Sequence, residues 1–351
     1  MPNTQPTLSV IITSYNYESF IATAIDSLLA QDPRPEIIVV DDCSTDSSRD
    51  IISAYGDQVI PVFQEHNQGH GGAFNAGFEK ASGTLVMFLD ADDFMLPGVT
   101  ERILSNYSAD TAIYHYRMKY ADDEGKLWGC HPPMESPLAD GDLSQQLRTV
   151  GDYRGTITSG LVFSRGALEQ VLPMNAEKYR QGGDGYLTAT VPLYGPSASF
   201  DEPMSAYRLH GAQHSQFAKA YAKRARWRLA HAYERYDSIK DHAARLGLSV
   251  APDLGAADAG TIKERLISLL FEAEQHPYPE DSIPALAKQT KAAYADTTSG
   301  PGALIQSIWW MLFGLVPAGA KQTMMSWDID AAARPGWLQS IGRTLRGRSN
   351  D

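Results

Sequence analysis

The sequence predicts an α/β fold with a mostly parallel, wound sheet, followed by a helical C-terminal extension. Strand-like and helix-like segments alternate over the first hundred residues, which is typical of βα units and a parallel sheet. From about residue 101 to 215 the pattern is irregular, and beyond residue 216 apolar residues recur at three- or four-residue steps. We therefore expect residues 1–100 and 101–215 to be two halves of one domain, and residues 216–351 to be helical.

The elements of the first half follow in a regular order. The expected strands are the apolar runs at residues 8–13, 37–40, 59–63 and 85–89. Helices are expected between them, where apolar residues share one face, at residues 21–29, 44–55 and 73–80. The glycine-rich segment Asn67-Gln68-Gly69-His70-Gly71-Gly72 is expected to be a turn before the third helix.

Composition narrows the classes of function. The chain has 351 residues, 43% of them hydrophobic, and a formal net charge of −12, which argues against a general nucleic-acid-binding protein. Cys43 and Cys130 lack the spacing of a metal site and the density of a disulfide scaffold, so reduced thiols are expected. The segment from Met1 to Thr7 is polar and shows no secretion signal, so a cytoplasmic location is expected.

The most informative segment is the strand at residues 85–89 with the acidic turn that follows it. Asp90, Asp92 and Asp93 come directly after apolar residues, and parallel sheets bind ligands at the carboxyl ends of their strands. Asp90 and Asp92 point to the same side of an extended segment, so their carboxylates can converge on one hard divalent cation. The alternative is a solvated acidic turn that caps the next element.

Two other expected strands also end in polar residues that a core does not require. The segment Thr13-Ser14-Tyr15-Asn16 follows the first strand, and Asp41-Asp42 follows the second. Because the carboxyl ends of parallel strands meet at one edge of a sheet, we expect these residues to form one rim with the acidic turn.

These segments resemble the family-2 glycosyltransferases, which are inverting enzymes with the GT-A fold, a Rossmann-like, mostly parallel wound sheet. The resemblance covers about residues 7–215 in order and spacing. The matching segments are Val10-Ile11-Ile12-Thr13-Ser14-Tyr15-Asn16, Val39-Val40-Asp41-Asp42-Cys43-Ser44-Thr45-Asp46, Asn67-Gln68-Gly69, Asn75-Ala76-Gly77 and Phe88-Leu89-Asp90-Ala91-Asp92-Asp93. Each segment alone is a weak signal, whereas five in this order are highly specific.

The resemblance implies a pocket for a nucleotide-sugar, expected to be UDP-linked. Thr13, Tyr15 and Asn16 would line its base and ribose end, Asn75 would also contact the donor, and Asp41 would accept a hydrogen bond from the base. A carboxylate beside a buried imide N–H makes a charge-assisted hydrogen bond, and an aromatic ring can cover the base. Helix capping stays open as the alternative for Asp41, and plain packing for Tyr15.

The resemblance also implies a divalent cation, Mn²⁺ or Mg²⁺. Asp92 would be its main ligand, Asp90 would bind the ribose or share the metal, and His210 would complete the metal shell or touch the diphosphate. Such a cation stabilises the negative charge of the leaving nucleoside diphosphate. Asp93 is either a further ligand or a cap of the following turn.

Asp184 is the expected catalytic base. Inversion requires a base that removes the proton of the acceptor hydroxyl, and such a group contributes typically about 10²–10⁴-fold in rate. Asp184 falls where the family shows a Glu-Asp pair, although Gly183 replaces the first acid. The alternative is an ordinary Asp-Gly turn.

Residues 206–215 resemble the closing segment of the family. Arg208 is expected to pair with phosphate, and His214 competes with His210 for the metal, with a structural histidine as the alternative. The chain departs from the family a second time at Phe74, where many relatives carry an arginine, so any base or phosphate contact of that arginine is absent. Compensation by His66, His70 and the glycine-rich segment is the alternative to a loop that only shapes the edge of the sheet.

Residues 303–320 are apolar apart from two polar side chains, and their length is borderline for spanning a bilayer. Trp309 and Trp310 suit a membrane interface, and arginines alternate with apolar residues in the tail. The favoured prediction is peripheral contact of residues 303–348 with an anionic membrane surface, on the inner face of the membrane. A core helix, a helix that pairs two copies in a homo-oligomer, and a true span are the alternatives.

We therefore predict an inverting, metal-dependent glycosyltransferase that moves a sugar from a nucleotide-sugar to a hydroxyl of a saccharide, lipid-linked or polymeric acceptor. Residues 1–100 would bind the donor and residues 101–215 the acceptor. One rival is a catalytically degenerate nucleotide-sugar-binding partner, which the departures at Gly183 and Phe74 motivate. The other is a sugar-phosphate nucleotidylyltransferase, which would carry a glycine-rich loop with Arg and Lys where this chain has Thr13-Ser14-Tyr15-Asn16.

Overall fold

The computed structural model describes residues 5–210, 221–297, 301–329 and 335. These residues form two compact units: residues 5–210 with 234–254, and the remaining described residues. The expected boundary at residue 216 lies outside the described residues. The C-terminal half of the helix that follows it belongs to the first unit.

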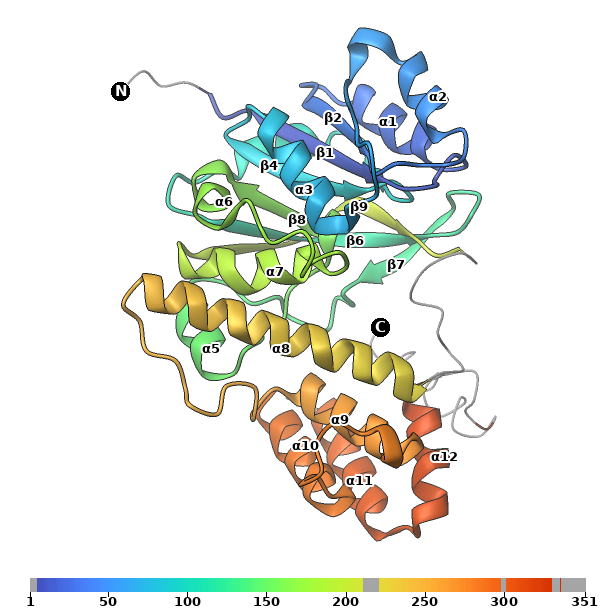
Figure 1. The fold of residues 1–351 in the computed structure, drawn as a ribbon, viewed down its shortest axis with the longest axis vertical. Coiled ribbons are helices and arrows are strands. Elements are labelled where there is room, and N and C mark those ends of the chain that lie inside the picture. The colour runs from blue at the N-terminus through green and yellow to red at the C-terminus, as the bar shows by residue number, and fades with distance from the viewer. Residues whose placement is uncertain (1–4, 211–220, 298–300, 330–334, 336–351) are drawn as a thin grey trace. The chain divides into compact units, whose positions relative to one another are not determined.

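One sheet runs through the whole first unit (Figure 1). Its strands in the described part of the chain are β1 (Leu8–Ser14), β2 (Glu36–Asp41), β3 (Ile60–Phe63), β4 (Leu85–Asp90), β5 (Phe94–Met95), β6 (Ile113–Ala121), β7 (Leu127–His131), β8 (Leu161–Ser164) and β9 (Ser197–Arg208). They lie in the order β3-β2-β1-β4-β8-β6-β9-β5, and β7 pairs with β6.

The longer strand pairs are parallel. These are β1 with β2, β1 with β4, β2 with β3, and β6 with β9, whereas β8 pairs antiparallel with both of its neighbours. The expected α/β fold with a mostly parallel sheet is therefore confirmed. The two expected halves share this sheet, because β6, β8 and β9 continue it beyond residue 100.

The helices of the first unit are α1 (Ile21–Leu29), α2 (Ser48–Ala54), α3 (Gly69–Lys80), α4 (Val99–Ser105), α5 (Ser144–Thr149), α6 (Arg165–Val171), α7 (Gly183–Thr190) and the C-terminal half of α8 (Tyr221–Arg245). Short 3₁₀ turns occur at η1 (Gly56–Gln58), η2 (Thr158–Gly160) and η3 (Val191–Leu193).

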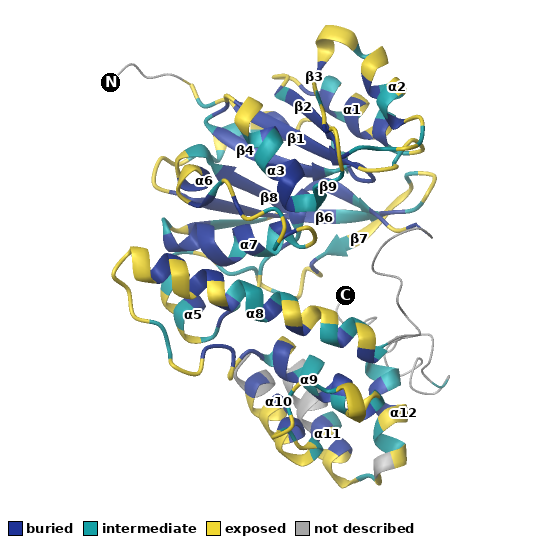
Figure 2. Ribbon diagram, in the orientation of Figure 1, coloured by how far each residue is buried: buried dark blue, intermediate teal, exposed yellow. Residues whose placement is uncertain are grey.

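The central strands β1, β2 and β4 are buried on both faces and are dark in Figure 2, whereas β3 and β7 are largely exposed. Val10 and Ile12 of β1 belong to one core cluster with Ile25 of α1, whereas Ile11 between them belongs to a second cluster with Phe74 of α3. Successive side chains of a strand point to opposite faces, so a strand covered on both faces must be apolar throughout. This requirement explains the unbroken apolar runs of the sequence.

The second unit is helical. Besides the N-terminal half of α8 it contains α9 (Ala259–Phe271), η4 (Ala273–Gln275), α10 (Ile283–Thr297), α11 (Pro301–Leu315) and α12 (Ala318–Ile329). Its core includes Leu266, Leu286, Phe313 and Met325. The apolar stretch at residues 303–320 is thus divided between α11 and α12, and the tail at residues 336–351 lies outside the described residues.

Helix α11 buries one face and exposes another. Phe313 is fully buried, whereas Ile308, Met311, Leu312 and Leu315 are between 43% and 76% exposed. Their spacing places these four side chains on one stripe of the helix. In the part of the chain that the structure describes, no helix has the length and apolar character that crossing a membrane requires.

The middle of β6 carries a buried histidine. His115 is fully buried, its Nδ1 accepts a hydrogen bond from the Thr156 N–H at 3.3 Å, and its Nε2 lies 3.3 Å from the Tyr153 hydroxyl. Burial lowers the pKa of His115 from 6.5 to about 3. The folded protein therefore holds this ring neutral at pH values where an unfolded chain would bind a proton.

This difference predicts a loss of stability in mild acid. Between about pH 6.5 and about pH 3 the unfolded state takes up a proton at His115 that the folded state refuses, so the free energy of unfolding falls as the pH falls. In the wild type, His115 makes the free energy of unfolding fall by up to about 1.4 kcal/mol for each pH unit of acidification. Asparagine cannot titrate, so we expect His115→Asn to lack this part of the pH dependence. Urea unfolding at pH 7 and pH 5 measures it, with the exposed His66→Asn as control. Equal pH dependence of both variants would contradict the prediction.

Candidate functional site

The carboxyl ends of β1, β2 and β4 bring predicted site residues to one edge of the sheet. β1 lies between the other two strands, and Ser14 pairs with Asp41 while Thr13 pairs with Asp90. Because all three strands are parallel, the segments that end them lie side by side. The rim expected from the sequence is therefore formed.

Helix α3 begins earlier than expected, at Gly69 rather than at residue 73. The Asp42 carboxylate accepts hydrogen bonds from the N–H of Gln68 at 2.7 Å and of Gly69 at 2.8 Å. These are N–H groups that a helix start leaves without intrahelical partners. The glycine-rich segment is therefore the first turn of α3 rather than a separate turn before it.

This first turn of α3 holds the segment that leads to Asp184. The N–H groups of His70 and Gly71 donate to the carbonyl oxygens of residues 180 and 179, at 2.8 and 2.9 Å. Gly69 has a φ of +77°, and a Cβ there would lie 2.5 Å from the carbonyl oxygen of residue 180, so only glycine fits. Asp184 follows in the first turn of α7 and stays partly exposed.

Gly183, where the chain departs from the family, is packed against the start of α3. Gly183 is buried, and a Cβ there would already touch the backbone nitrogen of Gly71 at 3.4 Å and the sulfur of Met174 at 3.5 Å. The starts of α3 and α7 approach each other closely at this point. Both distances are ordinary van der Waals contacts, so a Cβ at residue 183 would fit and packing does not explain the missing acid.

Asp41 is fully buried, with one carboxylate oxygen bound and one left over. Its Oδ1 accepts from the Ser44 N–H at 3.0 Å and from Arg49 Nε at 2.6 Å. Its Oδ2 is buried without a hydrogen-bond partner among the described residues. Oδ1 thus fixes the loop before α2, and Oδ2 remains for a donor from outside the chain.

Asn16 ties the end of β1 to the loop after β2. Its Oδ1 accepts from the Thr45 N–H at 2.7 Å, and its own N–H donates to Ser44 Oγ at 2.9 Å. Its φ of +61° is a conformation that asparagine tolerates better than most residues. The Tyr15 ring is 44% exposed and projects from this fixed loop.

The acidic turn after β4 presents its carboxylates in different surroundings. The Asp90 side chain is 35% exposed, and its Oδ1 lies 3.7 Å from His70 Nε2. Asp92 is nearly buried, and its Oδ2 lies 2.9 Å from His210 Nε2. Burial and the charge of Asp90 raise the pKa of Asp92, while His210 opposes them.

Asp93 and Arg208 hold the acidic turn together from inside. Asp93 is buried and accepts from the Arg208 N–H at 3.0 Å, and burial raises the pKa of Asp93 well above its usual range. The Arg208 guanidinium is buried and donates to the carbonyl oxygens of Asp92 at 2.9 Å and of Asp123 at 3.0 Å. Asp93 thus binds the end of β9 rather than the turn that follows it, and its Oδ2 is buried without a partner among the described residues, while Arg208 donates to backbone carbonyls.

Asn75 is also engaged within the fold. Its Nδ2 donates to the Met174 carbonyl at 2.8 Å, and its Oδ1 accepts from the Met174 N–H at 2.9 Å. Both ends of the amide therefore fasten α3 to the segment before α7. The donor contact that the resemblance implies for Asn75 gains no support from this arrangement.

His70 lies at the site, whereas the sequence favoured a structural loop here over compensation for the arginine that Phe74 replaces. Burial by itself would lower its pKa, but the carboxylates of Asp90, Asp184 and Asp42 outweigh burial and raise it. His70 thus faces both the acidic turn and the expected base. Its position inside the matching glycine-rich segment was the available signal.

Tyr17 is a second residue that sequence reasoning missed. Burial and the charges of Asp92 and Asp90 raise the pKa of its hydroxyl, and its ring meets that of His210 edge-on with 6.4 Å between centroids. Tyr17 therefore closes one side of the Asp92–His210 pair. It lies just beyond a matching segment, and nothing in its spacing indicated this contact.

The side chains at this edge fit a divalent cation that completes its shell with atoms of a bound ligand. Within the ranges that the structure describes, no group of three or more His, Cys, Asp or Glu side chains is arranged to hold a metal ion. Asp92 and His210 offer a carboxylate and an imidazole in contact, and Asp90 offers a carboxylate at the rim. Mg²⁺ is usually held by one or two carboxylates together with substrate phosphates, so a partial protein shell suits it. His214 lies outside the described residues.

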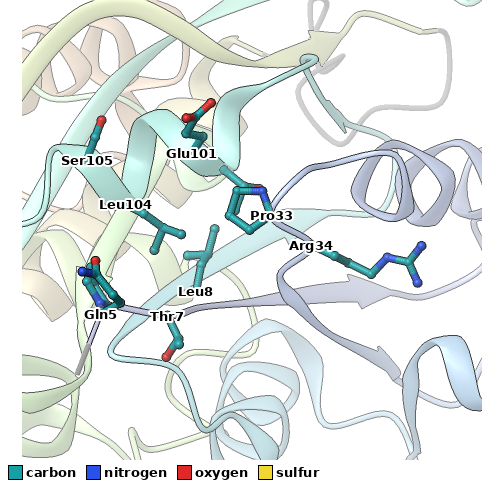
Figure 3. Close-up of a pocket in the computed structure, with 10 residues that line it drawn as sticks. Gln5, Thr7, Leu8, Pro33, Arg34, Glu101, Leu104 and Ser105 are labelled. Carbon is teal, nitrogen blue, oxygen red and sulfur yellow. The ribbon is translucent and has the colours of Figure 1, made fainter.

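A cavity of about 450 Å³ opens at another part of the first unit (Figure 3). Thr7, Leu8, Arg34, Glu101 and Leu104 line it. It therefore lies at the amino end of β1, away from the acidic carboxyl edge. None of the predicted site residues contributes to it.

Comparison with known proteins gives one consistent family. The family model described as Glycosyl transferase family 2 matches residues 9–172. An uncharacterized glycosyltransferase of Nostoc sp. (strain PCC 7120) is 35% identical over 254 residues, which cover 70% of this chain and 79% of that protein. The poly(ribitol-phosphate) beta-N-acetylglucosaminyltransferase TarS of Staphylococcus aureus is 36% identical over 93 residues, 25% of this chain and 16% of that protein.

Solved glycosyltransferase structures share the fold. TarS of S. aureus in complex with UDP-GlcNAc matches with a TM-score of 0.50 and 16% identity, over 91% of this chain and 90% of that chain. A mannosyltransferase from Pyrobaculum calidifontis in complex with GDP-Man and Mn²⁺ matches with a TM-score of 0.53 and 16% identity, over 95% of this chain and 87% of that one. The expected GT-A fold is confirmed.

Helix α3 reaches its position because residue 77 has no side chain. A Cβ at Gly77 would lie 2.3 Å from Ile11 Cγ2, so we expect Gly77→Ala to lower the free energy of unfolding by about 1–3 kcal/mol. Gly166→Ala in α6 is the control, because a Cβ there meets nothing within 4 Å and should stabilise the helix by about 0.5–1 kcal/mol. Urea unfolding of both variants measures the difference. Equal stability of the two would contradict close packing of α3 on β1.

Proposed function

Because the chain belongs to glycosyltransferase family 2, we propose that it is an inverting enzyme that transfers a sugar from a UDP-sugar to a hydroxyl of a saccharide, lipid-linked or polymeric acceptor. The observation that carries this proposal is the gathering of four carboxylates at one edge of the sheet: Asp41, Asp90, Asp92 and Asp184. Asp41 and Asp90 end the parallel strands β2 and β4, Asp92 follows β4, and Asp184 is held near them by the start of α3.

Asp41 and Tyr15 would recognise the base. The unpartnered Oδ2 of Asp41 is an acceptor that the imide N–H of a uracil satisfies, and a buried acceptor without a partner costs about 1–3 kcal/mol. The exposed ring of Tyr15 would cover the face of the base. Thr13, beside Asp90 in the sheet, and Asn16, in the loop that carries Tyr15, would border the ribose.

Asp92, His210 and Asp90 would hold Mn²⁺ or Mg²⁺ at the diphosphate. Bound there, the cation would neutralise negative charge on the leaving diphosphate. Asp92 and His210 are already in contact, and Asp93 and Arg208 keep the acidic turn in place from behind. The structures with UDP-GlcNAc and with GDP-Man and Mn²⁺ contain these classes of ligand in the same fold.

Asp184 would act as the base. The oxygen of the acceptor hydroxyl forms a bond to the anomeric carbon, the bond to the diphosphate oxygen breaks with its electron pair, and the hydroxyl proton passes to the Asp184 carboxylate. The exposure of Asp184 leaves its carboxylate accessible to such a hydroxyl. Gly183 replaces the first acid of the pair, so the degenerate-partner alternative stands until Asp184 is tested.

The exposed stripe of α11 supports contact with an anionic membrane surface on the cytoplasmic side. Ile308, Met311, Leu312 and Leu315 form an apolar face in the described part of residues 303–348. The arginines of the tail, at residues 334–348, would add attraction to anionic lipids but lie outside the described residues. An acceptor attached to a lipid would give such contact a purpose.

The donor site and the base can be tested separately. We expect Tyr15→Ala to weaken UDP binding by about tenfold, because stacking on a base is worth about 1–3 kcal/mol. Asp184→Asn should keep UDP affinity and lower UDP-sugar turnover by about 10²–10⁴-fold. Thermal shift with UDP and Mn²⁺, and release of UDP from UDP-sugars, provide the two measurements.

The control for both variants is Asp57→Asn, an exposed substitution in η1 that should change neither quantity. Absence of stabilisation by any uridine nucleotide would contradict the donor assignment. A wild-type protein that binds UDP but is as inert as Asp184→Asn would instead support the degenerate-partner alternative.

Membrane contact can be tested with anionic vesicles. We expect the double substitution Leu312→Asp and Leu315→Asp to lower the cosedimenting fraction several-fold, because charged residues on the apolar stripe oppose insertion. Leu246→Asp, at an exposed leucine outside α11, is the control. If both proteins sediment like the wild type, α11 is not the contact.

A further inference from the structure

The outer end of strand β6 carries a row of aromatic rings. Tyr120 pairs across the sheet with Trp128 of β7 and with Tyr207 of β9, so these three side chains stand on one face. The Trp128 indole stacks on the Tyr120 ring, with 5.8 Å between centroids and 22° between planes. The ring centroid of Tyr207 is 6.3 Å from that of Tyr120, and the centroid of His131 is 5.9 Å from Tyr120 and 5.7 Å from Tyr207. These four residues are called the aromatic row.

The inner end of the aromatic row lies in the electrostatic field of the acidic turn. Burial and the charges of Asp93, Asp92 and Asp90 raise the pKa of the Tyr207 hydroxyl to about 12. The row is therefore continuous with the edge at which the predicted metal ligands gather.

The strand register gives the distance from the acidic edge to the outer part of the row. Met87 of β4 and Tyr114 of β6 both pair with Val162 of β8, and β8 runs antiparallel to both strands, so β4 and β6 are parallel and level there. Asp90 comes three residues after Met87, and Tyr120 comes six residues after Tyr114. At a rise of about 3.3 Å per residue, Tyr120 stands about 10 Å beyond Asp90 along the strand direction.

Trp128 forms the outer end of the row and is open to a ligand. It is 44% exposed, and the hairpin turn beside it is coloured as exposed in Figure 2. The Tyr120 hydroxyl lies 3.3 Å from His131 Nδ1, so polar groups accompany the ring faces. A pyranose likewise has an apolar face of C–H groups and a rim of hydroxyls, and aromatic rings with polar groups suit such an amphipathic ligand.

The surroundings of Trp128 disfavour other occupants. Residues 119–126 carry three acids and two lysines, and the acidic turn lies beside the row, so an anionic lipid surface is not attracted. Pairing with β7 of a second copy is hindered, because the register shifts between Met118 and Tyr120 and because Gly129 has a φ of +49°. An uncharged saccharide meets neither obstacle.

We propose that the aromatic row is a distal saccharide-binding surface, which holds sugar residues of an acceptor chain beyond the one that reacts, with Trp128 as its anchor. The inference rests on the proposed function, because the acidic edge would carry the donor. A single sugar at the reacting position would leave Trp128 uncovered, since Tyr120 already stands about 10 Å beyond Asp90. The acceptor is therefore an oligosaccharide or polysaccharide rather than a monosaccharide.

Trp128 supplies a direct readout, because the other five of the six tryptophans lie at residue 227 or later. The full-length protein labelled with 5-fluorotryptophan is titrated with cellohexaose, mannohexaose and chitohexaose, and with glucose, mannose and N-acetylglucosamine. Trp128→Phe assigns the fluorine resonance of residue 128. We expect at least one hexasaccharide to shift this resonance saturably, and its monosaccharide to bind at least about tenfold more weakly, because only a chain covers several rings.

Trp128→Ala should weaken hexasaccharide binding, measured by calorimetry, by about tenfold or more, because it removes the exposed ring. Trp227→Ala is the matched control, since Trp227 is 48% exposed, also contacts a histidine ring and lies in α8 outside the row. The UDP affinity of both variants should stay within about twofold of the wild type, because each substitution is at the surface and away from the donor edge. Unchanged UDP affinity separates loss of the saccharide surface from a damaged fold.

The proposal is overturned if no hexasaccharide shifts the resonance of residue 128, if Trp128→Ala binds like Trp227→Ala, or if the monosaccharide binds as tightly as its hexasaccharide. It is equally overturned if the resonance responds only to protein concentration, which would indicate a second copy, or only to anionic vesicles. Hexasaccharide binding that follows the expected pattern in a protein that does not bind UDP would support the saccharide surface and contradict the proposed donor.

Discussion

The rest of the site depends on the hydrogen bonds that the Asp42 carboxylate accepts from the start of α3. Asp42 follows a buried parallel strand and accepts the first N–H groups of α3, so it fixes where that helix starts. The next N–H groups of α3 then bind the backbone of residues 179 and 180 and bring the start of α7 to the acidic edge. Only a glycine at residue 69 leaves room for α3 to lie this close to the backbone of residue 180. One buried charge thus connects the donor edge with the expected base.

The polar residues of the site divide into those that hold the fold and those that remain for a ligand. Arg208 and Asn75 form hydrogen bonds with backbone groups, and Asp93 accepts one from the end of β9. In contrast, Oδ2 of Asp41 and Oδ2 of Asp93 have no partner among the described residues, and the side chains of Asp90 and Asp184 are partly exposed. The first group makes the geometry rigid, which is what an electrostatic site requires to act without reorganisation.

The local pattern of the sequence predicted the strands and the polar edge of the sheet for a physical reason. A strand covered on both faces must be apolar throughout, and the polar residues that follow such strands must lie at the edge of the sheet. The strands and their acidic ends were therefore predictable, as was the family from five ordered motifs. The start of α3 was predicted too late, because the partner of its first N–H groups is Asp42, which precedes that start by about thirty residues of chain.

The sequence by itself determined the fold class, the family and the rim formed by Thr13, Asp41 and Asp90, because these follow from short-range pattern and strand order. Only the tertiary structure decided which polar atoms were already engaged. The Arg208 guanidinium, for example, is buried and donates to the carbonyl oxygens of Asp92 and Asp123, contacts that its motif did not indicate. Tertiary packing also places Arg235, far along the chain, beside Asp184 and Gly185, a proximity that no local pattern encodes.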